Sequence, residues 1–290
     1  MRKLLVVSIA CLGLTMALLV PSHLRAEALA EAGAQDYTQE RVRIVPAGNT
    51  PLVPANTVNG PVPKLPDGTV DLTGPWQGGG SNQDIEREGG LKPGELPLLP
   101  WAKALRDKRN ERDEPYVACL PMSVPRMNPF PWKFVMGYTA KGLTHIYVLH
   151  ELGDAGAHRV VYMDGRKHPP DLLPTWWGHS IGQLKGNTLV IDTVGYNDKF
   201  WFDSRGTPHT EQLHTIERWT RINYGTLVND FTLDDPGAFS RPVQLKFTAQ
   251  LIRQDLDLME FICNENNQAG IAGGFQLNNE PAKGLPLISR

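Results

Sequence analysis

The chain has 290 residues, of which 41% are hydrophobic and 21% charged, and its formal net charge is −2. A chain of this length and composition can bury the core of a globular protein, and its 28 glycines and 24 prolines favour turn-rich β-structure over a helical bundle. Its charge excludes nucleic acid as an expected partner, since phosphate binding needs a basic face.

The N-terminus has the pattern of an export signal. "MRK" is a short basic head, residues 4–20 are apolar, and "PSHLRAEALA" offers Ala-x-Ala-like cleavage after Ala26 or Ala28. A retained membrane anchor is the alternative, although the apolar run is at the short limit for spanning. Removal of residues 1–26 would change the formal net charge from −2 to about −5. We therefore predict a periplasmic or secreted protein that has no membrane contact after signal cleavage.

Residues 27–70 are rich in Pro, Asn and Gly and show no sustained period, which predicts an extended arm or linker. Residues 71–290 are expected to form a single domain. "VDLTGPW" (70–76) predicts a short strand. The segment 99–114 predicts a helix, with Pro100 in its first turn and Trp101 and Leu105 on its apolar face.

From Trp132 onward the pattern is that of strands joined by turns. Nine strand-like runs follow one another, and the last of them is "LDLMEFIC" (256–263). "VQLKFTAQL" (243–251) alternates most clearly between apolar and polar residues. Short links between successive strands predict an antiparallel up-and-down meander that closes into a barrel, with a β-sandwich as the alternative.

Such a meander places successive connections at alternating ends of the barrel. The long loops 165–178, 195–212 and 234–242 should therefore lie at one end, and the hairpins 185–187 and 223–225 at the other. Long loops gathered on one rim are the usual place for a binding site.

Cys119 and Cys263 are the cysteines that remain after export. In an oxidising compartment they most simply form one disulfide; two buried thiols and a pair of metal ligands are the alternatives. Neither has a CxxC neighbour, which argues against metal.

The first two long loops carry side chains suited to a small organic ligand. The alternative is that the same side chains only attach the loops to the core. As catalytic candidates we take His179, His209, His214, Asp203 and Glu211; as substrate-binding candidates, Trp176, Trp177, Trp201, Arg205, Arg218, Asn197 and Asp198.

The stretch "RGTPHTEQLH" (205–214) raises the alternative of a metal site formed by His209, Glu211 and His214. Its histidines are five residues apart, whereas HExxH places them four apart on one helix face. No regular helix or strand makes the three side chains converge. We therefore expect neither a metal nor another cofactor. On a strand, His214 and Arg218 would face one way and Glu217 and Trp219 the other.

The chain resembles a widespread family of secreted bacterial proteins of unknown function. The resemblance runs from about Asp71 to Asn266 and rests on "DLTG-W", "CLP", "DGR-HP", "GHS-G", "GDTLVVDT-G-ND", "G-PH-E-LH--ER" and "DDP". The chain departs from it at "LKGN" (184–187), where Trp-Glu-Gly-Asp is usual, so an acidic role at that turn is not expected. The resemblance implies export and a lipocalin-like barrel.

Three hypotheses of function follow. The first is an exported acid–base enzyme of lyase, isomerase or hydrolase type that acts on a small cyclic or partly apolar substrate at the barrel mouth. A histidine would transfer the proton, Asp203 or Glu211 would orient it, an arginine would bind an anionic group and tryptophans would stack on the ligand. The second is a binding protein with the same pocket. The third is a metal-dependent enzyme that uses the His/Glu/His cluster.

Overall fold

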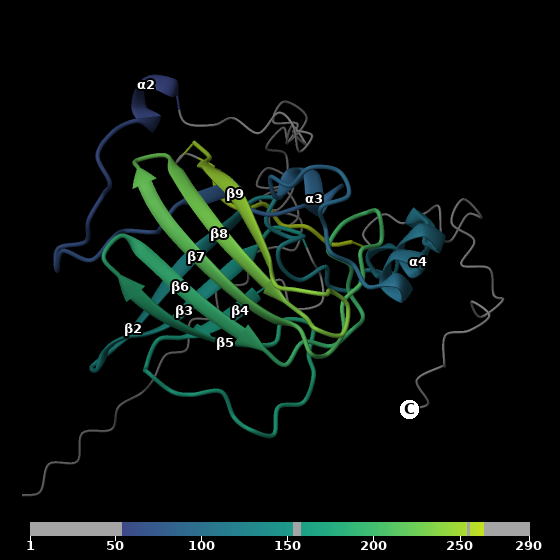
Figure 1. Ribbon diagram of the computed structural model, residues 1–290. Helices are drawn as coiled ribbons and strands as arrows, with labels where there is room; N and C mark the ends of the chain where they lie inside the picture. The colour runs from purple at the N-terminus through teal and green to yellow at the C-terminus, as the bar shows by residue number, and fades with distance from the viewer. Residues whose placement is uncertain (1–53, 153–157, 254–255, 264–290) are drawn as a thin grey trace, which may run out of the picture. The chain divides into compact units, whose positions relative to one another are not determined.

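The computed structural model describes residues 54–152, 158–253 and 256–263 (Figure 1). All of them belong to one compact unit, Ala47–Arg290. The predicted export signal and the predicted arm up to residue 53 lie outside the described residues. Within the described ranges, no helix is long and apolar enough to cross a membrane.

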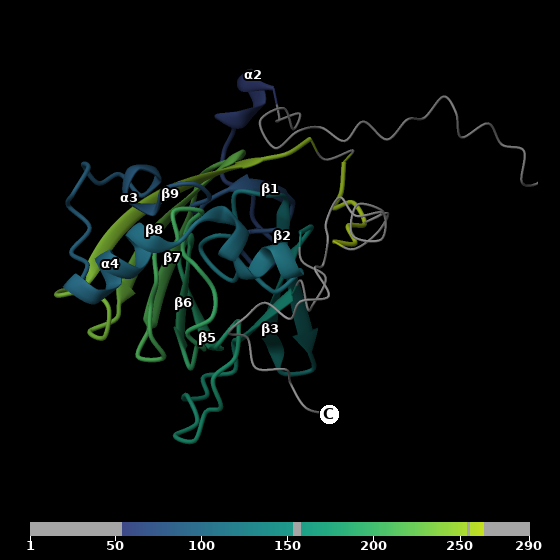
Figure 2. The ribbon, with the colours of Figure 1, turned by 90° about the vertical axis from the view of Figure 1, so that its right-hand side faces the viewer.

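Nine strands close into a barrel in chain order, as the sequence predicts (Figures 1 and 2). The short β1 closes it by pairing with both β2 and β9. The strands are β1 Pro75–Gly78, β2 Trp132–Thr139, β3 Gly142–His150, β4 His158–Tyr162, β5 His179–Lys185, β6 Thr188–Val194, β7 His214–Asn223, β8 Thr226–Asp234 and β9 Val243–Leu251.

The pairing departs from a pure antiparallel meander at one place. β4 and β5 are parallel, joined only at Val161↔Ser180 and Tyr162↔Ile181, and we call this pairing the seam. The connection 163–178 must therefore leave β4 beside Ile181 and return along the outside of the barrel to the start of β5 at His179. The loops 195–213 and 235–242 do share one end, and the hairpins after β5 and β7 share the other, as predicted. The first long loop reaches the long-loop end only with its last residues, where Thr175 bonds Gly195 and Asn197.

The prediction of a last strand at 256–263 is wrong. These residues lack strand pairing, and Leu256, Met259, Phe261 and Ile262 are exposed. The physical reason is that β1 already pairs with β9, from Trp76↔Leu251 to Gly78↔Ala249, so no free sheet edge is left there.

Alternate residues of each strand face the barrel interior. β9 follows the predicted pattern throughout, with Val243, Leu245, Phe247, Ala249 and Leu251 buried and the residues between them exposed. The interior is packed solid around Trp76, Trp132 and Trp219, and the ring centroids of Trp132 and Trp219 are 4.9 Å apart. The barrel interior is thus a core, and an open binding site has to lie elsewhere.

The helices lie at the two ends of the barrel (Figure 1). α2 Ala55–Val58 belongs to the predicted arm and contacts the β7–β8 hairpin, where Gly225 N donates to Val58 O. At the long-loop end lie α3 Ile85–Glu88 and α4 Pro100–Lys108, followed by the 3-10 turns Glu111–Asp113 and Pro115–Ala118. α4 is shorter than the predicted 99–114, because Arg109 is already extended.

One ion pair lies inside the barrel. Arg159 on β4 donates to Glu217 Oε1 on β7 at 2.6 Å and to the hydroxyls of Ser180 and Thr193 at 2.8 and 2.5 Å. Trp219 Nε1 donates to the other oxygen of Glu217 at 3.0 Å. Burial opposes the charge of Arg159, but the carboxylate of Glu217 outweighs it and raises the pKa of Arg159. The pair ties β4, at the seam, to β7.

The predicted disulfide is confirmed: Cys119 and Cys263 are bonded across 144 residues of sequence. A cross-link of this span restricts the unfolded chain strongly and contributes on the order of 2–5 kcal/mol to the stability of the fold.

We expect Cys263→Ser to lower the free energy of unfolding by about that amount in urea denaturation. Cys119→Ser/Cys263→Ser should match the single variant, and an unchanged midpoint would contradict the assignment.

Removal of one partner of the Arg159–Glu217 ion pair should lower the stability of the fold, because the other charge is then buried without its partner. Glu217→Gln is expected to destabilise the fold by about 3–5 kcal/mol, measured by guanidinium unfolding. Arg159→Met/Glu217→Leu should recover most of the loss. Arg218→Gln, at the exposed next position of β7, is the matched control and should change little. A full loss in the double variant would mean that the pair stabilises the barrel by its own attraction.

Candidate functional site

Four titratable side chains meet on the outer wall of the barrel. Leu189, Ile191 and Thr193 of β6 are buried in the interior, so Asp192 between them faces outward. His214 on β7 and His179 on β5 face outward by the same alternation, because Thr215 and Ser180 are buried. His168, from the connection 163–178, completes what we call the Asp192 cluster.

The Asp192 cluster is a continuous hydrogen-bonded chain. Asp192 Oδ1 lies 2.8 Å from His214 Nε2 and 3.2 Å from His168 Nε2. The other ring nitrogen of His168 lies 2.8 Å from His179 Nδ1. One of these two nitrogens must carry the proton of that bond. His168 and His179 thus bond each other directly, whereas Asp192 joins His168 to His214.

The seam brings His168 to this place. Because β4 and β5 are parallel, the connection 163–178 runs back along the outside of the barrel. It is anchored beside the start of the loop 195–213, where Thr175 N donates to Gly195 O and Asn197 N to Thr175 O. Leu172 packs against Gly195. With both ends held, His168 lies over the outer face of β6.

The surroundings shift the pKa values of the cluster in opposite directions. The hydrogen bond from His214 lowers the pKa of Asp192, and the same bond raises the pKa of His214. Partial burial lowers the pKa of His179, with further lowering by His168 and Arg166. His214 is thus biased toward the imidazolium and His179 toward the neutral imidazole.

Aromatic rings extend the site along the outer wall. Tyr162 stacks on His179 with ring centroids 5.1 Å apart, and His145 meets the edge of Tyr162 at 5.4 Å. The guanidinium of Arg166 lies 3.8 Å from the centre of the Tyr162 ring and forms an ion pair with Asp164. These contacts hold His179 and Arg166 in place.

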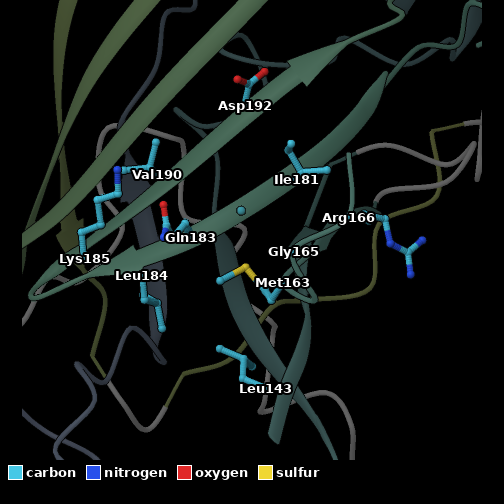
Figure 3. Close-up of a pocket in the computed structure, with 11 residues that line it drawn as sticks. Leu143, Met163, Gly165, Arg166, Ile181, Gln183, Leu184, Lys185, Val190 and Asp192 are labelled. Atoms are coloured by element: carbon cyan, nitrogen blue, oxygen red, sulfur yellow. The ribbon is translucent and has the colours of Figure 1, made fainter. Parts of the chain in front are cut away.

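A pocket of about 680 Å³ adjoins the cluster, and we call it the seam pocket (Figure 3). It reaches Asp192 at one side and wraps around the edge of β5 that faces β4. Ile181 and Val190 on the outer wall contribute apolar surface near Asp192. Its lining residues are Leu143, Met163, Gly165, Arg166, Ile181, Gly182, Gln183, Leu184, Lys185, Val190 and Asp192.

Of the predicted catalytic residues, the structure brings together only His179 and His214. His209 is 3% exposed and packs between Phe200 and Phe202, with ring centroids 3.9 and 4.9 Å away; burial lowers its pKa to about 4. Asp203 is buried and orients no histidine, because its oxygens accept hydrogen bonds from Ile85 N and from Thr207. Glu211 is exposed.

Within the described part of the chain, no hydrogen bond or ion pair joins a predicted substrate-binding residue to the Asp192 cluster. Trp177 stacks on the buried His150, Trp176 packs against the core, and Trp201 lies under the guanidinium of Arg109. The remaining four predicted binding residues cap a turn, form an ion pair or face solvent. Arg205 forms an ion pair with Asp84, Asn197 accepts a hydrogen bond from Lys199 N, and Asp198 and Arg218 are exposed.

The metal alternative through His209, Glu211 and His214 gains no support. His209 is enclosed by phenylalanines, whereas His214 lies on the outer wall and bonds Asp192. Among the residues that the structure describes, no group of three or more His, Cys, Asp or Glu side chains is arranged to hold a metal ion.

Two members of the cluster were not among the predicted site residues. Asp192 is the acid in the otherwise apolar strand "TLVIDTV", and strand alternation alone would have predicted its outward position beside the apolar core residues. His168 stands in the first long loop, but no sequence pattern predicts that this loop crosses the barrel wall.

Comparison of the chain with protein-family models, with curated proteins and with solved structures gives no match.

The opposite pKa shifts of the two outer histidines can be measured by NMR titration. His214 should titrate above, and His179 below, the ordinary value of about 6.5. Asp192→Asn should lower the pKa of His214. Because the folded pKa of His214 is raised, its contribution to stability is present below about pH 6.5 and is lost as the pH rises through the folded value. A His214 pKa that is unchanged in Asp192→Asn would contradict the pairing.

Proposed function

We propose that the chain is an exported acid–base enzyme for a small, partly apolar molecule, and that the Asp192 cluster is its catalytic centre. His179 would accept a proton from the substrate and the imidazolium of His214 would donate one. Asp192 would hold His168 and His214 in position, and His168 would link the two outer histidines. Proton removal and proton return then balance, which fits an isomerase or lyase and, with water as co-substrate, a hydrolase.

The single observation that carries this proposal is the contact between Asp192 and two histidines. A carboxylate within hydrogen-bond reach of a histidine orients the imidazole and tunes its pKa for proton transfer, and plain binding needs no such arrangement. Asp192 Oδ1 lies within this reach, at 2.8 Å from His214 and 3.2 Å from His168. The geometry therefore favours an enzyme over the binding protein that is the alternative.

The pKa shifts support a division of labour. Groups whose surroundings push their pKa values apart are the usual acid and base of an active site. Here Asp192 raises the pKa of His214, while burial, with smaller effects of His168 and Arg166, lowers that of His179. Near neutral pH this favours a protonated acid and a free base within one hydrogen-bonded chain.

Access to substrate also supports this position. The side chain of Asp192 is 38% exposed and that of His214 36%, whereas His209 is enclosed by the core. The seam pocket reaches Asp192 and has the volume of a site for a small organic ligand. We therefore propose the outer wall, rather than the barrel mouth, as the place of the chemistry. The disulfide and the pattern of residues 1–26 support export.

A comparison of wild-type and Asp192→Asn proteins tests the proposal even while the substrate is unidentified. Each protein is incubated with a small-molecule extract of bacterial periplasm, and mass spectrometry follows which compounds are consumed or formed. We expect at least one compound to be converted by the wild type and to be converted about 100- to 1,000-fold more slowly by Asp192→Asn.

Asp230→Asn is the matched control, because Asp230 is also an outward-facing strand aspartate but pairs with Lys246 on β9. It should convert the same compound at the wild-type rate. Identical profiles for wild type and Asp192→Asn would rule out catalysis at the cluster and favour the binding protein.

A further inference from the structure

We propose that the seam pocket binds an elongated, largely apolar monoanion, with the anionic group at Lys185 and the reacting end at Asp192. The inference rests on the proposed function, because it identifies the substrate class of the same site. Four features of the pocket carry it: its floor, the free edge of β5, the placement of charge and its length.

The floor of the pocket is apolar and packs against the barrel core. Leu143, Met163 and Leu184 line it from three different segments, and all three also pack against the core cluster around Trp132. Their position is therefore set by the barrel interior. A preformed apolar floor favours a ligand with an apolar body, since burial of its surface stabilises the complex by about 25 cal/mol per Å².

The edge of β5 along the pocket is open. Pairing with β4 ends at Ile181, and residues 182–185 pair only with β6 among the strands that the structure describes. The backbone groups that face the pocket there have no partner strand. They can bind a polar group of the ligand, as unpaired edge groups do in other proteins.

The charged side chains of the pocket determine how an anionic ligand would be oriented in it. Arg166 already has two partners, because it forms an ion pair with Asp164 and stacks on Tyr162. Lys185, the other cation of the pocket lining, forms no ion pair within the described part of the chain and is available to a ligand. An anionic ligand is thus oriented with its charge toward Lys185.

The length of the site follows from strand register. Ile181 pairs with Asp192 and Lys185 with Thr188, so the two charged positions are separated by four residues of β5. Four residues span roughly 13 Å of strand. A ligand of one or two rings, or a short acyl chain, with a carboxylate, sulfonate or phosphate at its far end would reach from Lys185 to the Asp192 cluster.

Two fluorescent probes test the assignment directly. 1-Anilinonaphthalene-8-sulfonate is an apolar monoanion, and N-phenyl-1-naphthylamine has the same aromatic body without the sulfonate. Fluorescence titration of the full protein should show that Lys185→Gln weakens binding of the anionic probe about three- to fivefold, the effect of one partly exposed ion pair, and leaves the neutral probe unchanged. Ile181→Trp, which narrows the pocket, should weaken both.

Lys133→Gln is the matched control, because Lys133 lines a second surface pocket beside β2. It should leave both probes unaffected. Loss of the anionic probe in Lys133→Gln rather than Lys185→Gln, or equal effects of Lys185→Gln on both probes, would overturn the proposal. Asp192→Asn should retain or strengthen the binding of the anionic probe. If it does so while the wild type converts no compound, the proposed function fails and the pocket assignment stands.

Discussion

β4 and β5 run parallel in a barrel whose other neighbours are antiparallel, and the candidate site depends on this pairing. A parallel pair cannot be joined by a hairpin, so the connection 163–178 has to cross the outside of the wall. The crossing delivers His168 to Asp192. It also leaves the edge of β5 open beyond Ile181, and the seam pocket occupies that opening. With a hairpin between β4 and β5, neither the cluster nor the pocket would form.

The filled interior explains why the chemistry is proposed on the wall. The interior is occupied by tryptophans from β1, β2 and β7 and by the Arg159–Glu217 pair, in which Glu217 also accepts a hydrogen bond from Trp219. A barrel that is packed in this way has no room for a ligand. The polar residues at alternate strand positions face solvent on the outside of the barrel. His179, Asp192 and His214 lie there on the adjacent strands β5, β6 and β7.

Partial exposure suits the proposed proton transfer. A carboxylate buried as deeply as Asp203 is used to hold backbone groups, and a histidine buried as deeply as His209 is held neutral. Asp192 lies between these extremes, since it is open enough to stay charged in water and enclosed enough to shift the pKa of His214. The residues that resembled a zinc motif thus divide, with His209 in the core and His214 at the candidate catalytic centre.

Local patterns in the sequence were enough to predict the strand order from β2 to β9, the inward face of β9, the disulfide and, to within a few residues, the start of the helix at Pro100. For β7 they predicted which residues share a face, but not which face is buried. These features follow from alternation, turn residues and cysteine count, which act over a few positions. The strand that closes the barrel is decided by tertiary structure, because the edge of β9 is occupied by 75–78 and not by the predicted strand 256–263. The parallel pairing of β4 with β5 is decided in the same way, and it is the reason that His168, His179, Asp192 and His214 share one site. Such convergence depends on where a connection crosses the barrel, and no local pattern contains that information.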